Sequence, residues 1–205
     1  MKTASQKTIE SYDKAAAFFG SVHPDRGFYK KEIGRFLTMC EGKKIIDIGC
    51  GEGRDAILFV DNGVDCTGID ASAAMIRQAR KNAVGAKFIQ MDFYDLKFPP
   101  RTFDGFWAAA SILHAPKRRV RKLLLNIGRI IKDGGVGFIS LRGEKSAGEG
   151  MVKEQKYGGI DRYFSYYGKK EFEYILKESK FKIIGKNEIK DGRKLWRCYF
   201  VKKIQ

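Results

Sequence analysis

Apolar runs and amphipathic stretches alternate along this chain from residue 43 onward. A short apolar run predicts a buried strand, whereas apolar residues that recur every three or four positions predict a helix. Segment 117–132 shows the helical pattern, because Val120, Leu123, Leu124 and Ile127 all fall on one face. The pattern predicts strands over 43–48, 65–70, 86–92, 103–111 and 134–141, and helices over 53–62, 72–83, 117–132 and 169–179.

The chain ends in two more strand-like runs, 181–189 and 195–203, which flank Asp191-Gly192. An Asp-Gly pair between two such runs is typical of a tight hairpin turn. The alternation of strands and helices before it indicates a parallel sheet with helices on both faces. We therefore predict an α/β fold with a doubly wound, mostly parallel sheet of seven strands and an antiparallel C-terminal hairpin.

The length of 205 residues suits one domain with a substantial core, so we expect a single domain over 1–205. Residues 1–42 precede the first strand and are expected to form one or two helices that cap the carboxyl edge of the sheet. Residues 43–141 hold the strand–helix alternation. Residues 142–205 are expected to hold a loop, a helix and the closing hairpin.

Positive charge is concentrated in the second half of the chain. The net charge is +16, and residues 103–205 contain 24 basic against 11 acidic residues. Such an excess can attract nucleic acid, an acidic surface or an anionic substrate. It can also reflect solvated faces, which is the interpretation we favour for the cluster KRRVRK (117–122), because it lies on a predicted amphipathic helix.

The sequence shows no segment that targets or spans a membrane. No apolar run approaches the length of a membrane span, and the first residues lack the apolar core of a signal peptide. The four cysteines, Cys40, Cys50, Cys66 and Cys198, lie far apart without the paired spacing of a metal site. We therefore expect a cytoplasmic protein with reduced thiols and no metal.

The segment DIGCGEGRD (47–55) places three glycines where the first strand passes into the first helix. In open α/β sheets, ligands bind at the carboxyl ends of the strands, and glycine lets a ligand approach the backbone closely. A P-loop would need a lysine and a hydroxyl after Gly53, and a dinucleotide fingerprint would need its third glycine where Arg54 stands. The spacing, with Asp47 two residues before the first glycine, suits a ligand without a pyrophosphate.

At these positions the sequence resembles the class I S-adenosylmethionine-dependent methyltransferases. The resemblance rests on IIDIGCGEG, GID, MDFYDLKF and FDGFWAAASILHAP in the family's order, with LKESKF before the terminal hairpin, and it covers roughly residues 10–203. The fourth motif has the form common among small-molecule methyltransferases akin to the tellurite and thiopurine enzymes. The resemblance implies a Rossmann-like fold, S-adenosylmethionine as cofactor and S-adenosylhomocysteine as product, with 43–141 as the cofactor-binding half.

The resemblance also implies which residues contact the cofactor. Asp70, at the end of the second strand, would accept hydrogen bonds from both ribose hydroxyls. Asp47 would hold the ammonium group of the methionine portion, and Asp92 would accept from the adenine amino group. Cofactor contacts are expected from Tyr12, Asp47, Gly49, Cys50, Gly51, Gly53, Asp70, Ala71, Met75, Asp92, Phe93 and Ala108.

The methyl acceptor is less constrained by the sequence. The fourth motif reads FWAAAS and lacks the Asn/Asp-Pro-Pro-Tyr/Phe signature of amino-group methylation on bases, which favours a small molecule. His114 is a candidate general base, and a structural histidine is the equal alternative. Arg142, Arg162, Tyr163 and Tyr166 are candidates for binding an acidic or aromatic acceptor, and we expect the glycine-containing segment 141–172 to act as a lid over it.

Two other classes of function stay open at this point. The basic half could serve RNA, either in an RNA methyltransferase or in a non-catalytic RNA-binding protein on the same fold. A nicotinamide-dependent oxidoreductase would use the same strand-to-helix turn. Methyl transfer to a small molecule is the function that we predict from the sequence.

Overall fold

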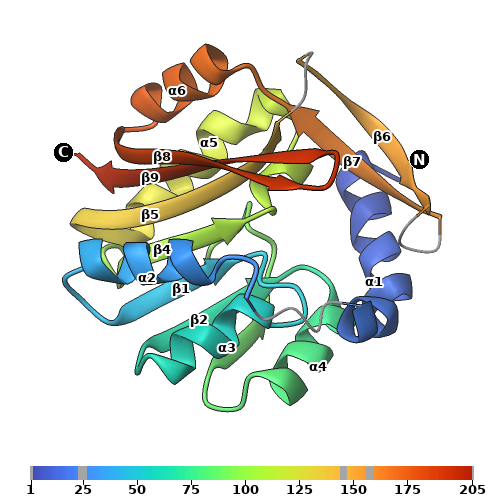
Figure 1. Ribbon diagram of the computed structural model, residues 1–205, viewed down its shortest axis with the longest axis horizontal. Helices are drawn as coiled ribbons and strands as arrows, with labels where there is room; N and C mark the ends of the chain where they lie inside the picture. The colour runs from blue at the N-terminus through green and yellow to red at the C-terminus, as the bar shows by residue number, and fades with distance from the viewer. Residues whose placement is uncertain (1, 23–26, 144–146, 156–158, 205) are drawn as a thin grey trace.

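A seven-stranded sheet runs through the middle of the molecule (Figure 1). The computed structural model describes residues 2–22, 27–143, 147–155 and 159–204. The strand order is β3-β2-β1-β4-β5-β9-β8, and only β9 pairs antiparallel to its neighbours on both sides. The strands are β1 (Lys44–Ile48), β2 (Asp65–Asp70), β3 (Lys87–Gln90), β4 (Phe103–Ala109), β5 (Ile131–Gly143), β8 (Phe181–Asp191) and β9 (Lys194–Lys203).

Helices cover both faces of this sheet (Figure 1). Helices α2 (Lys30–Met39), α3 (Arg54–Asp61) and α4 (Ala73–Asn82) pack on one face, and α5 (Lys117–Ile130) and α6 (Lys169–Glu178) pack on the other. The Rossmann-like, mostly parallel seven-stranded fold predicted from the sequence is therefore confirmed. Within the described ranges, every helix is too short or too polar to serve as a membrane span.

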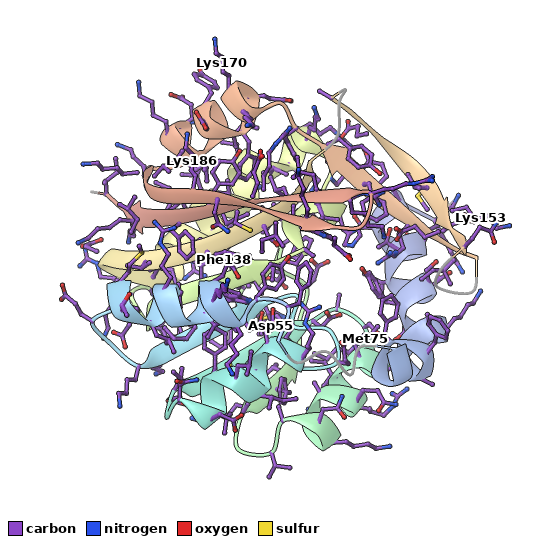
Figure 2. The ribbon with its side chains drawn as sticks, viewed as in Figure 1. Asp55, Met75, Phe138, Lys153, Lys170 and Lys186 are labelled. Carbon is purple, nitrogen blue, oxygen red and sulfur yellow. The ribbon has the colours of Figure 1, made fainter. Side chains whose placement is uncertain are left out.

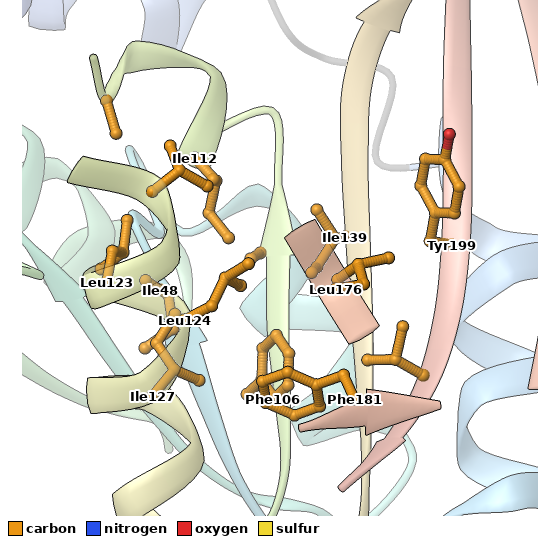
Figure 3. Packing of buried hydrophobic residues seen from close by; sticks show 14 of the residues in the cluster. Ile48, Phe106, Ile112, Leu123, Leu124, Ile127, Ile139, Leu176, Phe181 and Tyr199 are labelled. Carbon is orange, nitrogen blue, oxygen red and sulfur yellow. The ribbon is translucent and has the colours of Figure 1, made fainter. Parts of the chain in front are cut away.

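The sheet is buried on both sides because apolar residues on its central strands point to alternate faces. On β1, Ile45 joins the cluster under α2 and α3, whereas Ile46 and Ile48 join the cluster under α5 and α6. Trp107 on β4 stacks on Phe138 of β5 on the first face, with ring centroids 3.8 Å apart. The second face is packed against the apolar stripe of α5 and against α6, as Figure 3 shows.

Two local predictions are confirmed. The terminal hairpin pairs Asp191 with Lys194 across a turn in which Gly192 has a φ of 56°. Ser72 caps α4, because its hydroxyl accepts a hydrogen bond from the Met75 N–H at 3.1 Å. A side-chain acceptor at this position satisfies one of the amide groups that the first turn of a helix leaves unpaired.

The segment 141–172, predicted as a loop, forms regular structure instead. Strand β5 continues to Gly143, and β6 (Gly148–Glu154) and β7 (Ile160–Tyr166) pair antiparallel as a separate two-stranded sheet. The correction follows from the pattern of β7, where Arg162 and Phe164 are buried on one side. The expected lid is therefore a paired hairpin, apart from residues 144–146 and 156–158, which lie outside the described residues.

The helical cap predicted for residues 1–42 consists of α1 (Ala4–Val22) alone. Helix α2 packs on a face of the sheet, where Ile33 and Phe36 join the buried cluster of β1 and α3, so it does not cover the edge. The predicted boundary at 132 is also shifted, since α5 ends at Ile130 and β5 begins with Ile131, which pairs with Phe103.

Helix α1 bridges the β6–β7 hairpin and α4 over the carboxyl edge of the sheet (Figure 1). At one end, the Thr8 hydroxyl accepts a hydrogen bond from the Tyr163 N–H at 2.9 Å. Further along, the Asp13 carboxylate accepts from the Ser72 hydroxyl at 2.6 Å and from the Ala74 N–H at 3.0 Å. These bonds hold α1 in place as a roof above the strand ends where ligands bind in such sheets.

Candidate active site

A cavity of about 370 Å³ lies between this roof and the carboxyl ends of the strands. Its size falls within the range of about 300–1,000 Å³ that is usual for small-molecule sites. Asp55 from α3 and Met75 from α4, both labelled in Figure 2, are among its lining residues. The candidates that line it are Tyr12, Asp47, Gly49, Cys50, Gly51, Asp70, Ala71, Met75, Asp92, Phe93, His114, Arg142 and Arg162.

The glycine turn between β1 and α3 forms the floor at one end of the cavity. Gly49, Gly51 and Gly53 all have positive φ, at 72°, 56° and 82°. The N–H groups of Gly49 and Cys50 donate to the Ile69 carbonyl at 2.8 and 2.9 Å, which fixes the turn to the end of β2. Backbone with positive φ is available to glycine at little cost, so the sequence builds this turn with glycine.

Gly53 lies in the same turn but outside the lining of the cavity. A Cβ at this position would lie 3.1 Å from Cα and Cβ of Ala79 on α4. Gly53 therefore serves the close packing of α3 against α4 and is not among the predicted cofactor residues that line the cavity.

Asp70 stands where β2 ends, between the glycine turn and α4. Its carboxylate accepts hydrogen bonds from the Gly51 N–H at 3.1 Å and from the Ser72 N–H at 2.8 Å, one on each oxygen. Burial raises its pKa to about 6 despite these hydrogen bonds. Each carboxylate oxygen can accept more than one hydrogen bond, so Asp70 retains acceptor capacity toward a ligand.

Acidic side chains predominate at this end of the cavity. Burial, followed by the neighbouring Asp55, raises the pKa of Asp47 well above its usual range. Asp55 is itself held by the Arg54 Nε–H at 2.8 Å and the Trp107 indole N–H at 2.9 Å. The acids that line the cavity here are Asp47, Glu52, Asp55, Asp70 and Asp92, and the accompanying cation is Arg54.

The last residue of β4 and the two residues after it line the cavity, whereas the predicted Ala108 does not. Ala108 is buried within the sheet and pairs with Ile139, whereas Ala109, Ala110 and Ser111 line the cavity. Ala110 has a φ of 54°, a conformation that is uncommon for a residue with a Cβ and is often found at functional sites.

Ser111 is a site residue that the sequence did not reveal. It is 5% exposed, and its hydroxyl is buried without a hydrogen-bond partner among the described residues. A Cβ on Gly49 would lie 2.5 Å from the Ser111 Cβ, so the two residues are in close contact. An unpaired buried hydroxyl beside the glycine turn is available to a bound ligand.

His114 belongs to the short helix η1 (Ile112–His114) and has both ring nitrogens engaged. Nε2 lies 2.7 Å from the Tyr12 hydroxyl, and Nδ1 lies 2.6 Å from the Tyr163 carbonyl. Because a carbonyl only accepts, Nδ1 carries the proton and Nε2 accepts from Tyr12. The Tyr12 hydroxyl in turn accepts from Arg162 Nη1 at 2.6 Å. Removal from bulk water, followed by the nearby Arg162 charge, lowers the pKa of His114 to about 3.

This network ties α1 to the hairpin through neutral His114, and it does not favour the predicted role as a general base. A general base needs a free lone pair aimed at the substrate and a pKa near the working pH. The single acceptor nitrogen of His114 is already occupied by Tyr12.

Two of the four predicted acceptor residues lie outside the lining of the cavity. Tyr163 is on the side of β7 opposite to Arg162. Burial, followed by contact with Glu149, raises the pKa of Tyr163 to about 12. Tyr166 stacks on Phe164 with centroids 5.9 Å apart and packs against the core under α5 and α6.

Among the described residues, no group of three or more His, Cys, Asp or Glu gathers as a metal ion would require.

Several known proteins are similar to this chain in sequence. Residues 45–135 match the family described as a methyltransferase domain. O-methyltransferase resE from Aspergillus sclerotiorum is 28% identical over 172 residues, which make up 79% of this chain and 63% of that protein. The 2-methyl-6-phytyl-1,4-hydroquinone methyltransferase from Synechocystis is 36% identical over 48% of this chain and 32% of that protein. The chain thus spans less than two thirds of the length of either relative.

A solved structure extends the likeness to almost the whole fold. The 1,6-didemethyltoxoflavin-N1-methyltransferase from Burkholderia thailandensis, with bound 1,6-didemethyltoxoflavin and S-adenosylhomocysteine, superposes with a TM-score of 0.69. The match covers 94% of this chain and 88% of that one at 16% identity. At this level of identity, the likeness is one of fold.

Proposed function

We propose that this chain, whose residues 45–135 match a methyltransferase domain, is a class I S-adenosylmethionine-dependent methyltransferase that transfers a methyl group to a small molecule in the cavity. The observation that carries the proposal is the acidic end of the cavity beside the glycine turn. S-adenosylmethionine, the cofactor of this family, carries a sulfonium and an ammonium group and no phosphate. The acids that line this end of the cavity, with no lysine among them, suit that charge.

The chain's own residues fit the cofactor group by group. Asp70 retains acceptor capacity for ribose hydroxyls, and the buried carboxyl of Asp47 is proposed to hold the ammonium group of the methionine portion. Ser111 offers a buried hydroxyl without a partner, next to Gly49. Asp92 is exposed at the cavity lining, where one carboxylate oxygen accepts from the Tyr94 N–H at 2.9 Å, and this carboxylate is proposed to accept from the adenine amino group.

The main contribution of the protein to the reaction is to orient the acceptor toward the methyl group of the cofactor. When bound, the cofactor supplies a methyl group on a positively charged sulfur. The wall formed by Tyr12, His114 and Arg162 and the roof formed by α1 restrict the acceptor to one approach and exclude water. His114 is proposed as a positioning residue that holds Tyr12 in this wall.

The names of the relatives support a small-molecule acceptor, since they refer to O-methylation, a hydroquinone and a toxoflavin precursor. The alternative of RNA methylation gains no support from these names. The cluster at 117–122 places Arg118, Arg121 and Lys122 on the exposed face of α5, and Lys170 points outward from α6 in Figure 2. The finer resemblance to the tellurite and thiopurine enzymes stays a prediction.

Binding of S-adenosylhomocysteine tests the proposal directly. We expect calorimetry to give one S-adenosylhomocysteine per chain and no saturable binding of NADH, because the turn lacks a phosphate-binding residue. Tight NADH binding without any response to S-adenosylhomocysteine would refute the proposal. A screen of small-molecule acceptors with labelled cofactor then identifies the substrate.

The pH dependence of the free energy of unfolding tests the role of His114. Its folded-state pKa of about 3 lies below its ordinary value of 6.5, so the unfolded chain binds more protons between these values. The free energy of unfolding is therefore expected to fall as the pH decreases below about 6.5. His114→Gln keeps one donor and one acceptor but does not titrate, so urea unfolding should show a shallower decrease. Equal pH dependence in the two proteins would mean that His114 titrates normally.

A further inference from the structure

The chain leaves β4 through a strained turn at the wall of the cavity. Ala109 is the last residue of β4 and pairs with Ser140 of β5, and at Ala110 the backbone turns with a φ of 54°. A positive φ is disfavoured about tenfold for a residue with a Cβ, so it persists only where the surroundings impose it. Ala110 and the following Ser111 both line the cavity, so the geometry of this turn sets part of its wall.

The side chain of Ser140 binds the strained residue directly. Its hydroxyl accepts a hydrogen bond from the Ala110 N–H at 2.9 Å, whereas the Ser140 carbonyl accepts from the same N–H at 3.3 Å. The hydroxyl is therefore the nearer acceptor at the point where the pairing of β4 with β5 ends. Ser140 is 0% exposed and lies outside the lining of the cavity, so it can act on a bound ligand only through other residues.

Tyr29, in the segment before α2, fixes the Ser140 hydroxyl. The two hydroxyls are hydrogen-bonded at 2.8 Å. Tyr29 is 1% exposed, and its ring packs edge-on against the rings of Trp107 and Phe138, with centroids 5.9 and 5.6 Å away. A ring packed in this way holds its hydroxyl in one place, so the Ser140 oxygen keeps its position toward Ala110.

The turn determines where Ser111 lies. Ser111 is in close contact with the glycine turn, since a Cβ on Gly49 would lie 2.5 Å from the Ser111 Cβ. Its hydroxyl is buried without a hydrogen-bond partner among the described residues. Rotation of Ala110 to an ordinary negative φ would redirect the chain that carries Ser111 and η1, and would move this hydroxyl away from the glycine turn.

We propose that Ser140 is a positioning residue of the proposed cofactor site. Its hydroxyl holds Ala110 at positive φ, and this conformation keeps Ser111 beside the glycine turn, where the Ser111 hydroxyl meets the cofactor. The inference rests on the proposed methyltransferase function, because that function makes the cavity a cofactor site.

Replacing Ser140 by alanine should weaken S-adenosylhomocysteine binding about tenfold, as measured by calorimetry. Without the hydroxyl, Ala110 takes a negative φ in most molecules, and the apparent dissociation constant rises as the fraction of molecules competent to bind falls. A tenfold change corresponds to about 1.4 kcal/mol of binding free energy. Unchanged affinity in a folded Ser140→Ala protein overturns the proposal.

Ala110→Gly separates positioning from a loss of stability. Glycine adopts a positive φ about as readily as a negative one, so the double variant Ser140→Ala/Ala110→Gly should bind within about twofold to threefold of the wild type. In the wild-type background the same substitution should bring no such gain, because Ser140 already imposes the conformation. Absence of rescue, or an equal gain in the two backgrounds, means that the two positions act independently and overturns the proposal.

Ser179→Ala is the matched control for the loss of a buried hydroxyl. Ser179 is 1% exposed, its hydroxyl donates to the Ile175 carbonyl at 2.7 Å, and it lies outside the lining of the cavity. This variant should lose stability in urea unfolding and keep its affinity for S-adenosylhomocysteine. A loss of affinity equal to that of Ser140→Ala overturns the proposal, since it would follow from stability alone.

The carbon-13 chemical shift of the Ala110 Cβ depends on φ and is measured without any ligand. It should change in Ser140→Ala and stay as in the wild type in Ser179→Ala. If the wild-type protein binds no S-adenosylhomocysteine, the proposed function fails, and this shift alone decides whether Ser140 holds the turn. An unchanged shift in Ser140→Ala means that other contacts impose the conformation, which overturns the proposal.

Discussion

Replacing Asp70 by alanine is expected to weaken S-adenosylhomocysteine binding by at least about tenfold. In the folded protein, the Asp70 carboxylate accepts hydrogen bonds from the N–H groups of Gly51 and Ser72. We propose that it also accepts from the ribose hydroxyls. Alanine leaves these donors without a partner, at a cost of about 1–3 kcal/mol for each one that is buried. Every 1.4 kcal/mol or so corresponds to a factor of about ten in the dissociation constant, which calorimetry measures directly.

Asp65→Ala is the matched control, because Asp65 begins the same strand, at the end away from the cavity. It is exposed and pairs with Lys87 at 3.0 Å, an interaction worth little at a surface. S-adenosylhomocysteine affinity should be unchanged in this variant. An unchanged dissociation constant in a folded Asp70→Ala protein would contradict the role given to Asp70.

The pH dependence of binding provides a second measure of Asp70. Because its pKa is about 6, the Asp70 carboxylate of the unliganded protein becomes protonated as the pH falls below about 6. A protonated carboxyl accepts fewer hydrogen bonds. Affinity should therefore fall with decreasing pH, by up to about tenfold per unit. Glu52 and Asp47 also have raised pKa values, so the difference between the wild-type slope and the shallower Asp70→Ala slope measures the share of Asp70.

The raised pKa of Asp70 makes the unliganded protein more stable as the pH falls, whereas it makes the affinity for the ligand weaker. Between about 6 and the ordinary 3.8, the folded protein binds the proton that the unfolded chain has released. Asp70 therefore stabilises the unliganded fold as the pH falls through about 6, and it costs stability at neutral pH. A group that lowers stability at the pH at which a ligand would use it is characteristic of a binding site and not of a packing residue.

The sequence predicts which residues line the end of the cavity beside the glycine turn, because that end is built from local motifs. Asp47, Gly49, Asp70 and Asp92 each lie at or within two residues of the end of a strand, and parallel strands bring their carboxyl ends to one edge. The predicted Ala108 lies inside β4, one residue before the first position of this segment that lines the cavity, and the end of a strand is the least certain part of a sequence pattern.

The end of the cavity lined by residues of β5, β6 and β9 depends on contacts between distant parts of the chain, and the sequence predicts it poorly. Glu154, Arg142 and Lys194 come from three different strands, and no local pattern shows that they meet. One signal was available and was missed. The segment IDRYFSY (160–166) is rich in residues that favour strands, and neighbours on a strand face opposite sides, so Arg162 and Tyr163 cannot both line the cavity.

Gly49→Ala is expected to remove most of the affinity for S-adenosylhomocysteine and to destabilise the fold by about 2–5 kcal/mol. The residue has a φ of 72°, which costs a residue with a Cβ about 1–2 kcal/mol. The new Cβ would also lie 2.5 Å from the Ser111 Cβ, and overpacking of this kind costs about 1–3 kcal/mol more. Relief of the clash moves the glycine turn away from η1, and both of these elements line the proposed cofactor site.

Gly63→Ala separates the two causes, because Gly63 has nearly the same φ, 71°, but its nearest neighbour, Lys43 Nζ, is 4.0 Å from the added Cβ. This control should lose only about 1–2 kcal/mol in urea unfolding and keep its full affinity for S-adenosylhomocysteine, since it lies outside the lining of the cavity. If the two variants lose equal stability and bind equally well, the contact with Ser111 does not constrain the turn. If Gly49→Ala alone loses binding, the turn needs glycine there for its close approach to η1 and not only for its backbone angle.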